Sequence, residues 1–468
     1  MSKRFTIFTY GCQMNRYDSE TITGYLAQEG YEHCDDPSRS DLILLNTCSI
    51  RDKAEQKVFS QLGRLRKLKR SNPGLKIGVC GCFATREGAN IARKQLGVDL
   101  IFGTQNIDKL PELLKDLGVG PVCDTDPIEP DFANLAPIRR NDGLSAYVSI
   151  ARGCDNFCTF CVVPHTRGPE WSKPSGLIVE EIEAAVGEGF KEIHLLGQNV
   201  NSYGKKTPDE LTFGGLLRRL DRIDGRERIR FMTSHPLDCD EDMISAMADC
   251  GKVCEHLHLP VQSGSDEVLR RMERGYTADE YLSKVALFRE RVPEGVLTSD
   301  VIVGFPGETD EDLEGTLRVL RESRFENIYL FKYSPRPGTR ALSMADQVPE
   351  KVKTERFLAV QQLQRETSEE LHQEAEGSVV EVMVEGAAPE KASRDACCGG
   401  PGGKLVQIST IPRKFAGRSR GNHRVNFYVK GGEPLPGDVV EVKVLRGALH
   451  KLEGVSPPDA VCMEEWAT

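Results

Sequence analysis

The stretch Cys154-Asp-Asn-Phe-Cys158-Thr-Phe-Cys161 decides the fold of this chain, because it places three cysteines in eight residues at the spacing CxxxCxxC. It follows the apolar segment Ser145 to Ala151, which the pattern predicts to be a strand, so the cysteines are expected in a loop at a strand's end. Thiolates are the soft ligands that a 4Fe-4S cluster prefers, and one compact loop can bind three of its irons. Because no fourth cysteine follows at ferredoxin spacing, one iron would stay open to another ligand.

Two simpler explanations of these cysteines stay open. His165 lies four residues after Cys161 and could complete a Cys3His zinc site, although zinc-binding cysteines are usually paired as CxxC. The thiols could also be buried without any ligand. The spacing favours an iron–sulfur cluster, and it resembles the signature of the radical S-adenosylmethionine (SAM) superfamily. That resemblance implies that the amino and carboxylate groups of SAM bind the open iron.

The composition is that of a globular protein with several domains. A length of 468 residues suggests about three domains, and 39% hydrophobic and 28% charged residues are enough for sizeable cores. The chain opens with MSKRFTIFTYGC, which lacks the pattern of a secretion signal, and no apolar run is long enough to span a membrane. We therefore expect a cytoplasmic protein whose fifteen cysteines are reduced, some of them binding metal. A net charge of −10 argues against a protein that coats nucleic acid without selectivity.

Residues 3–118 are predicted to form an α/β domain with a parallel sheet, because strand-like and helical segments alternate. Strand candidates are Arg4–Tyr10, Leu42–Leu45, Lys76–Val79 and Leu100–Phe102. Cys12, Cys48 and Cys82 follow the first three of these strands. The carboxyl ends of parallel strands lie on one edge, where ligands bind, so the three thiols are expected to converge. They could hold a second 4Fe-4S cluster, or they could be ordinary buried thiols.

Short motifs around these cysteines resemble the N-terminal domain of the methylthiotransferases. The motifs are Gly11-Cys12-Gln13-Met14-Asn15, Asn46-Thr47-Cys48-Ser49-Ile50-Arg51 and Gly81-Cys82. The continuation Asp52–Leu65 is most similar to the branch that acts on isopentenyladenosine in tRNA, whereas the ribosomal-protein branch typically has GCPKN at the first motif. The resemblance implies that Cys12, Cys48 and Cys82 bind an auxiliary 4Fe-4S cluster. Cys80 is not at a ligand position and is expected to be a packed thiol.

Residues 119–141 contain four prolines and are predicted to be a linker, and βα alternation resumes over residues 140–370. Six strands are expected there: Tyr147–Ile150, Glu192–Leu196, Ile229–Met232, His256–Leu259, Leu297–Val303 and Asn327–Phe331. They predict a partial (β/α)6 barrel, the architecture of radical SAM cores, with active groups at the carboxyl ends of the strands.

Polar and glycine-rich motifs follow the carboxyl ends of these predicted strands. The residues expected to bind SAM are Gln198, Asn199, Ser234, Gln262, Asp300 and Gly304. The stretch Arg167-Gly-Pro-Glu170-Trp-Ser172 resembles the family's RGxExS motif, although His165 stands where tyrosine is common.

Residues 373–454 are predicted to form a small OB-like β-barrel, with short strands at Gly377–Glu385, Arg424–Lys430 and Asp438–Leu445. The stretch Gly417–Phe427 resembles a TRAM domain, an RNA-binding module. Residues 413–424 hold five Lys or Arg and no acid, and Phe415 and Phe427 flank them, which suits phosphate contact and base stacking. The residues expected to bind RNA are Arg418, Arg420 and Arg424.

Two further segments are ambiguous. Residues 51–70 hold eight Lys or Arg against two acids, which suits either RNA contact or an ordinary solvated helix face. Ala388–Lys404 is longer than the usual TRAM hairpin, and its pair Cys397-Cys398 fits a flexible glycine-rich loop better than a metal site.

Together these resemblances imply a radical SAM methylthiotransferase that modifies carbon 2 of N6-isopentenyladenosine at position 37 of tRNA, 3′ of the anticodon. A 5′-deoxyadenosyl radical would break the unactivated C–H bond, and the auxiliary cluster would present the sulfur. The implied partners are tRNA, SAM and a reductant such as flavodoxin or ferredoxin, with no membrane and a monomeric chain. Two alternatives remain: a sibling enzyme acting on threonylcarbamoyladenosine or on a ribosomal-protein aspartate, and an RNA-binding iron–sulfur protein without activity.

Overall fold

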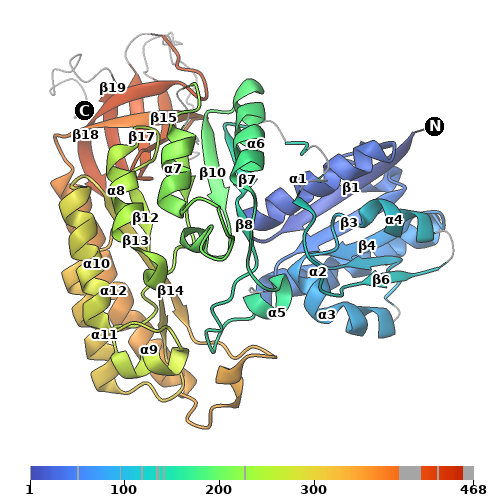
Figure 1. The fold of residues 1–468 in the computed structure, drawn as a ribbon, viewed down its shortest axis with the longest axis horizontal. Coiled ribbons are helices and arrows are strands. Elements are labelled where there is room, and N and C mark those ends of the chain that lie inside the picture. Colours follow the sequence, from blue (N-terminus) through green and yellow to red (C-terminus); the bar gives the residue numbers. More distant parts are fainter. Residues whose placement is uncertain are drawn as a thin grey trace, which may run out of the picture.

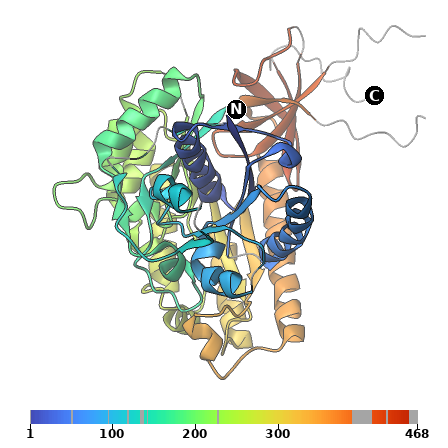
Figure 2. The same cartoon turned by 90° about the vertical axis from the view of Figure 1, so that its right-hand side faces the viewer.

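The computed structural model describes residues 2–49, 52–94, 96–117, 120–132, 135, 138–140, 143–225, 228–388, 413–429 and 432–456, with only the backbone of 52–55. Figure 1 shows three parts: an N-terminal domain in blue and cyan, a central domain from green to orange, and a small C-terminal barrel in red. The N-terminal domain and the barrel both lie against the central domain (Figures 1 and 2). Among the helices in the described ranges, none has the length and apolar character needed to cross a membrane.

The N-terminal domain is a parallel six-stranded sheet in the order β2-β1-β3-β4-β5-β6, with helices on both faces. Alternate residues of the central strand point into two different cores, Leu42 and Leu44 into one, Ile43 and Leu45 into the other. The strands are β1 (Lys3–Tyr10), β2 (Tyr31–His33), β3 (Leu42–Thr47), β4 (Lys76–Cys80), β5 (Leu100–Phe102) and β6 (Val122–Asp124). The helices are α1 (Gln13–Gln28), α2 (Asp52–Ser71), α3 (Cys82–Arg93) and α4 (Leu110–Asp116).

The hydropathy pattern did not indicate the two edge strands of this sheet, β2 and β6. Each has three residues, and none of the six is fully buried. A short, half-exposed edge strand carries no apolar run, so composition alone does not reveal it. Because β6 lies within residues 119–141, the segment predicted as a linker also extends the sheet.

The central domain confirms the predicted partial barrel. Its six strands form two parallel sheets, β7-β10-β11 and β12-β13-β14, and a parallel bridge joins Ile229 of the first sheet to Val253, three residues before β12. The strands are β7 (Ser145–Ser149), β10 (Glu192–Leu196), β11 (Arg228–Phe231), β12 (His256–His258), β13 (Val296–Val303) and β14 (Asn327–Lys332). The larger helices are α6 (Ser175–Gly187), α7 (Phe213–Asp221), α8 (Glu241–Asp249), α9 (Asp266–Met272), α10 (Ala278–Arg291), α11 (Asp310–Ser323) and α12 (Glu350–Glu374).

A short antiparallel hairpin carries the CxxxCxxC loop. Its strands are β8 (Ala151–Arg152) and β9 (Trp171–Ser172), and the cysteine loop and helix α5 (Val163–Arg167) lie between them in the sequence. Gly153 has φ of +82°, and a Cβ there would lie 1.8 Å from the carbonyl oxygen of Pro169. Only glycine fits this crossing, so the residue before Cys154 is fixed by backbone packing.

The C-terminal module is a closed five-stranded barrel in the order β15-β16-β17-β19-β18, which confirms the predicted OB-like fold. The strands are β15 (Val379–Ala387), β16 (Lys414–Ser419), β17 (Arg424–Val429), β18 (Val439–Ala448) and β19 (Lys451–Ser456). The long helix α12 leads into it from the central domain (Figure 1). Apart from Ala388, the Ala388–Lys404 segment with Cys397 and Cys398 lies outside the described residues.

The expectation that Phe415 and Phe427 stack on RNA bases is wrong. Both rings are buried in the barrel core, with centroids 6.1 Å apart. Strand alternation explains this, because residues 414–419 and 424–429 are strands whose apolar positions face inward while their basic positions face outward.

Candidate functional site

Cys12, Cys48 and Cys82 follow β1, β3 and β4, three neighbouring strands of the N-terminal sheet. Cys12 precedes α1 as its N-cap residue, and Cys82 is the first residue of α3. The backbone N–H of Cys48 donates to the carbonyl of Tyr10, 2.9 Å away, and a Cβ on Gly11 would lie 2.8 Å from the Cβ of Cys48. The parallel topology therefore brings the three loops together at one edge, as predicted.

The motif asparagines hold these loops in place. The Asn15 carbonyl oxygen Oδ1 accepts from the backbone N–H of Cys12 at 3.2 Å, and it lies 3.4 Å from the Cys12 sulfur. Asn15 Nδ2 donates to Asn46 Oδ1 at 3.2 Å, and Asn46 Nδ2 donates back to the Asn15 carbonyl at 2.8 Å. Both asparagines are fully buried. They lock the loop after β1 to the end of β3, which explains their place in the GCQMN and NTC motifs.

A buried arginine from the central domain reaches this cysteine triad. Arg167, the last residue of α5, donates from Nε to the sulfur of Cys82 at 3.2 Å. Its Nη2 and Nη1 donate to the Asp18 carboxylate at 2.7 and 3.3 Å, and Arg167 and Asp18 are 5% and 1% exposed. Burial raises the pKa of the Cys82 thiol to about 11, while the guanidinium charge opposes that rise. The guanidinium is thus placed to stabilise a thiolate at Cys82.

The second triad, Cys154, Cys158 and Cys161, lies on the hairpin loop. The N–H of Cys154 donates to the Gly168 carbonyl at 3.1 Å, and the N–H of Cys161 donates to the Cys158 carbonyl at 3.0 Å. Burial raises the thiol pKa of Cys161 to about 12 and that of Cys154 to about 11, and neighbouring cysteines of the triad add to both increases. The three sulfurs are therefore close neighbours whose thiolate forms need a positive partner.

A second buried arginine supplies positive charge to this triad. Arg274, which follows α9 and is 5% exposed, donates from Nη1 to the Cys158 sulfur at 3.3 Å. Its Nε donates to the Tyr276 hydroxyl at 3.1 Å and its Nη2 to the Pro260 carbonyl at 3.0 Å. The two triads share one design: each has a ligand-type sulfur that accepts a hydrogen bond from a buried guanidinium.

The geometry of both triads suits a group larger than one zinc ion. Among the described residues, the only three His, Cys, Asp or Glu side chains whose ligand atoms all lie within 4.8 Å of one another are Glu326, His372 and His423, so neither cysteine triad is that compact. A zinc ion with bonds of about 2.3 Å would hold its sulfurs about 3.8 Å apart. His165 is exposed on α5 and does not complete a Cys3His set. Converging thiols that form no disulfide fit an iron–sulfur cube.

Most of the residues expected to bind SAM lie near the carboxyl ends of the barrel strands. Gln198 Oε1 accepts from the backbone N–H of Gly153 at 2.5 Å, directly before the cysteine loop. Asn199, Ser234 and Gln262 each carry a buried side-chain oxygen that has no hydrogen-bond partner among the described residues. His235 Nε2 is also buried without such a partner. Because buried polar atoms are normally paired, these orphaned atoms indicate the place of a polar ligand.

The other two expected residues differ from this group. The Asp300 carboxylate is 30% exposed and lies 3.5 Å from Nε2 of His258. Gly304 has φ of +71°, and a Cβ there would lie 2.3 Å from Cγ of Lys353 on α12. Its N–H donates to the Glu308 carboxylate at 2.9 Å. The contacts of Gly304 are thus those of a residue that lets α12 pack against the loop after β13.

The sequence interpretation missed three arginines of the site. Arg167 was visible only as part of an RGxExS match, and Arg274 lies more than a hundred residues from Cys158 without any motif. Arg152, two residues before Cys154, is 6% exposed, and none of its guanidinium nitrogens has a hydrogen-bond partner in the described part of the chain. It lies 5.6 Å from the Phe132 ring and lines a small pocket between the N-terminal and central domains together with Arg167. In the sequence, the position of Arg152 next to the cysteine motif could have indicated that it belongs to the site.

The three arginines expected to bind RNA have different surroundings. Arg420 donates from Nε and Nη2 to the Glu255 carboxylate at 2.6 to 3.0 Å and from Nη2 to the Val253 carbonyl, which ties the barrel to the central domain. Arg418 is about one third exposed and pairs with Glu385 at 2.9 Å. The side chain of Arg424 is exposed, and its guanidinium makes no hydrogen bond or ion pair with any described residue. Of the three, Arg424 is the most accessible cation.

Comparison with known proteins identifies both larger domains. Residues 4–103 match the model of "Uncharacterized protein family UPF0004", and residues 148–320 match that of the radical SAM superfamily. The tRNA-2-methylthio-N(6)-dimethylallyladenosine synthase of Acetivibrio thermocellus is 45% identical over 97% of this chain and 90% of its own length. The synthase of the same name from Aquifex aeolicus is 44% identical over 97% of this chain and 98% of its own length.

Solved structures agree on the fold alone. The radical S-adenosylmethionine methyltransferase TsrM from Kitasatospora setae, with cobalamin and a [4Fe-4S] cluster bound, has a TM-score of 0.57 at 18% identity over 73% of this chain and 77% of that chain. The cobalamin-dependent S-adenosylmethionine radical enzyme OxsB, in its apo form, has a TM-score of 0.52 at 15% identity over 78% of this chain and 56% of that chain.

Proposed function

The chain belongs to the tRNA-2-methylthio-N(6)-dimethylallyladenosine synthases of the radical SAM superfamily, and on that premise we propose that it methylthiolates carbon 2 of N6-isopentenyladenosine in tRNA. The observation that carries the proposal is the pair of thiol triads joined by α5. This helix begins two residues after Cys161 and ends in Arg167, which donates to Cys82. One short segment therefore connects the two places where cofactors would bind.

Cys154, Cys158 and Cys161 would hold the 4Fe-4S cluster that binds SAM, and Cys12, Cys48 and Cys82 would hold the auxiliary one. When bound, the two clusters and SAM supply a radical able to break the C–H bond of the base and a sulfur to replace the hydrogen. The chain's own contribution is electrostatic. Arg274 and Arg167 offset the negative charge of the thiolates, and the long side chains keep water from the sulfurs.

The orphaned polar atoms at the strand ends would position SAM. Asn199, Ser234 and Gln262 offer buried oxygen atoms, and an ammonium group donates to such oxygens. Gln198 is already hydrogen-bonded to the backbone before Cys154, so it would fix the cysteine loop relative to the same ligand. Asp300, partly exposed at the next strand, suits a ribose hydroxyl.

The tRNA would approach across the barrel, where Arg418 and Arg424 can meet phosphates. The target adenosine at position 37 lies in a single-stranded loop, and such loops let a base be splayed out and read. Completing the reaction needs electrons from a reductant such as flavodoxin or ferredoxin. We place the enzyme in the cytoplasm as a monomer.

The test offers three substrates to the reconstituted enzyme side by side: isopentenylated tRNA, threonylcarbamoylated tRNA and a ribosomal-protein peptide with the target aspartate. Mass spectrometry should find the methylthio group on the first alone, and none with the Cys158→Ala enzyme. An isopentenyl group needs only an apolar pocket, whereas a threonylcarbamoyl carboxylate needs a positioned cation. Product on either of the other substrates, with none on isopentenylated tRNA, would overturn the substrate assignment and leave the reaction type standing.

A further inference from the structure

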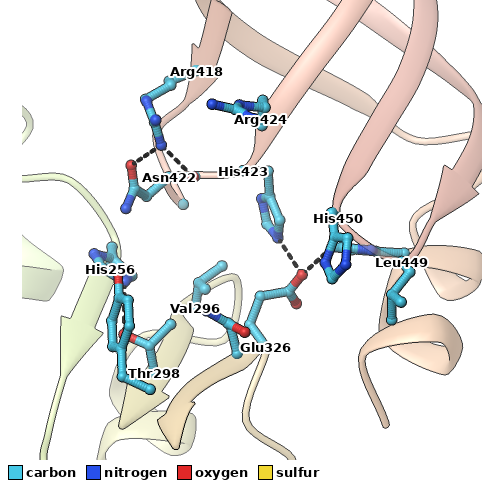
Figure 3. A pocket seen from close by; sticks show the side chains of 14 residues that line it. His256, Val296, Thr298, Glu326, Arg418, Asn422, His423, Arg424, Leu449 and His450 are labelled. Carbon is cyan, nitrogen blue, oxygen red and sulfur yellow. Dashed lines mark hydrogen bonds and ion pairs between the residues drawn. The ribbon is translucent and has the colours of Figure 1, made fainter. Parts of the chain in front are cut away.

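A cavity of about 270 Å³ lies where the C-terminal barrel meets the central domain, on the far side of the molecule from the N-terminal sheet. Its walls come from strands of both parts and from α12. Figure 3 shows His256 and Thr298 on one side of it and Glu326, His423 and His450 on the other. Four of the chain's nine histidines line this one cavity: His256, His372, His423 and His450.

Three of the lining side chains converge on a common point. Glu326 stands directly before β14, His372 lies in the last turn of α12, and His423 lies in the turn between β16 and β17. The ligand atoms of the three all lie within 4.8 Å of one another. His423 Nε2 is 3.2 Å from Glu326 Oε1, and His372 Nε2 is in still closer contact with the same oxygen. Figure 3 shows His423 and Glu326 pointing toward each other.

The far nitrogen of each imidazole is held by another group. His372 Nδ1 lies 2.6 Å from the carbonyl oxygen of Ala448, which can only accept, so Nδ1 carries the hydrogen. In a neutral ring this leaves a lone pair on Nε2, on the side of Glu326. His423 Nδ1 lies 3.0 Å from the hydroxyl of Ser419. A ring whose outer nitrogen binds a carbonyl or hydroxyl while its inner nitrogen faces a carboxylate has the arrangement of a metal-bound histidine.

An ion pair alone explains the arrangement of Glu326, His372 and His423 less well than a bound metal ion does. In an ion pair, an imidazole N–H would point at the Glu326 carboxylate and donate to it. However, Glu326 Oε1 is buried and neither imidazole donates to it with the geometry of a hydrogen bond. Two nitrogens and one oxygen therefore converge on one point, which is the arrangement that ligand atoms take around a cation.

We propose that Glu326, His372 and His423 bind a divalent transition-metal ion, with Zn²⁺ as the best fit. Metal–ligand bonds of about 2.0 to 2.1 Å place tetrahedral ligands about 3.3 to 3.4 Å apart, close to the 3.2 Å between His423 and Glu326, whereas the shorter His372–Glu326 contact must lengthen when the ion binds. Two imidazoles and one carboxylate suit zinc, and the fourth position faces the cavity, where water or an anion can bind. The three ligands come from the barrel, from α12 and from the residue directly before β14. The ion would therefore clamp the barrel to the central domain.

The site is tested by zinc content in the full-length, cluster-loaded protein. The wild type and variants are dialysed against Zn²⁺ and then against a weak chelator, and zinc and iron are counted by mass spectrometry. The wild type should retain one zinc per chain. Glu326→Gln and His423→Ala should each weaken zinc binding at least about tenfold, with their iron content unchanged.

His450→Ala is the matched control, since it removes an exposed imidazole from the same cavity without touching the three ligands. It should retain zinc as the wild type does. Zinc held by stray cysteines would persist in all variants and would overturn the proposal, as would a wild type that retains none. Circular dichroism and the iron count show whether a variant is folded. A Zn²⁺-dependent rise in Tm, present in the wild type and His450→Ala and absent in His423→Ala, is the second readout.

Discussion

Single residues set the electrostatics of the two thiol sites. Each triad has one sulfur that accepts from a buried arginine, Cys82 from Arg167 and Cys158 from Arg274. Hydrogen bonds to sulfur and nearby charge are two of the levers by which a protein tunes the reduction potential of an iron–sulfur cluster. A positive group stabilises the reduced, more negative state, so each arginine should raise the potential of the cluster beside it.

Replacing Arg274 with Gln should lower the midpoint potential of the cluster that we propose Cys154, Cys158 and Cys161 hold, by on the order of tens of millivolts, because a charge and a sulfur hydrogen bond are lost together. An anaerobic redox titration followed by electron paramagnetic resonance measures this shift. Arg270→Gln on the exposed face of α9, which breaks only the pair with Glu267, is the control. An unchanged potential in a folded Arg274→Gln protein would show that the guanidinium has only a packing role.

The hydropathy of the sequence predicts some strands of this fold and misses others. The six barrel strands and the three cysteine-bearing strands were predictable, because their apolar residues form short runs or alternate with polar residues at strand spacing. β2 and β6 were not, since short edge strands are half exposed. β16 was hidden because its outward basic residues dominated the interpretation, while Phe415 on its inner face is core. The cysteines were found by spacing, but Arg167 and Arg274 were not, because tertiary contacts alone bring them to sulfur.

The basic residues of the barrel have different surroundings: Arg420 ties the barrel to the central domain, whereas Arg424 is exposed. Arg424→Ala should weaken tRNA binding several-fold and reduce the slope of log affinity against log salt concentration by about 1, because one phosphate contact is lost. Filter binding at several salt concentrations measures both quantities. Arg321→Ala on α11, which removes an exposed cation of the central domain, should change neither. If both variants bind tRNA with the salt slope of the wild type, Arg424 is only a solvated side chain.

The whole molecule keeps its two thiol sites on separate cores. The N-terminal sheet has its own apolar clusters on both faces, and the barrel strands have another, so each domain can stay folded when the other loses its cofactor. The two domains are joined by contacts such as Arg167 with Asp18 and Thr104 with the carbonyl of Thr166, and by a small apolar cluster of Met14, Tyr17 and Leu196. Because each domain has a core of its own, we expect the two cysteine triads to bind their clusters independently.

Anaerobically reconstituted protein should therefore carry about eight irons, the sum of two 4Fe-4S cubes. Changing Cys154, Cys158 and Cys161 together to Ala should leave about four, and so should changing Cys12, Cys48 and Cys82. Iron and acid-labile sulfide per chain give the count, with far-UV circular dichroism as the fold control. A wild type that saturates at four irons would mean that one triad holds no cluster.

The short helix α5, which follows Cys161 and ends at Arg167, fixes the distance between these two residues. Five residues of hydrogen-bonded helix rise about 7.5 Å. The helical conformation of α5 thereby sets the distance from Cys161 to Arg167. An inserted residue would turn Arg167 by about 100° away from Cys82 and disconnect the sites at once. Chains of this architecture should therefore tolerate length variation in their outer loops but none at all along this segment.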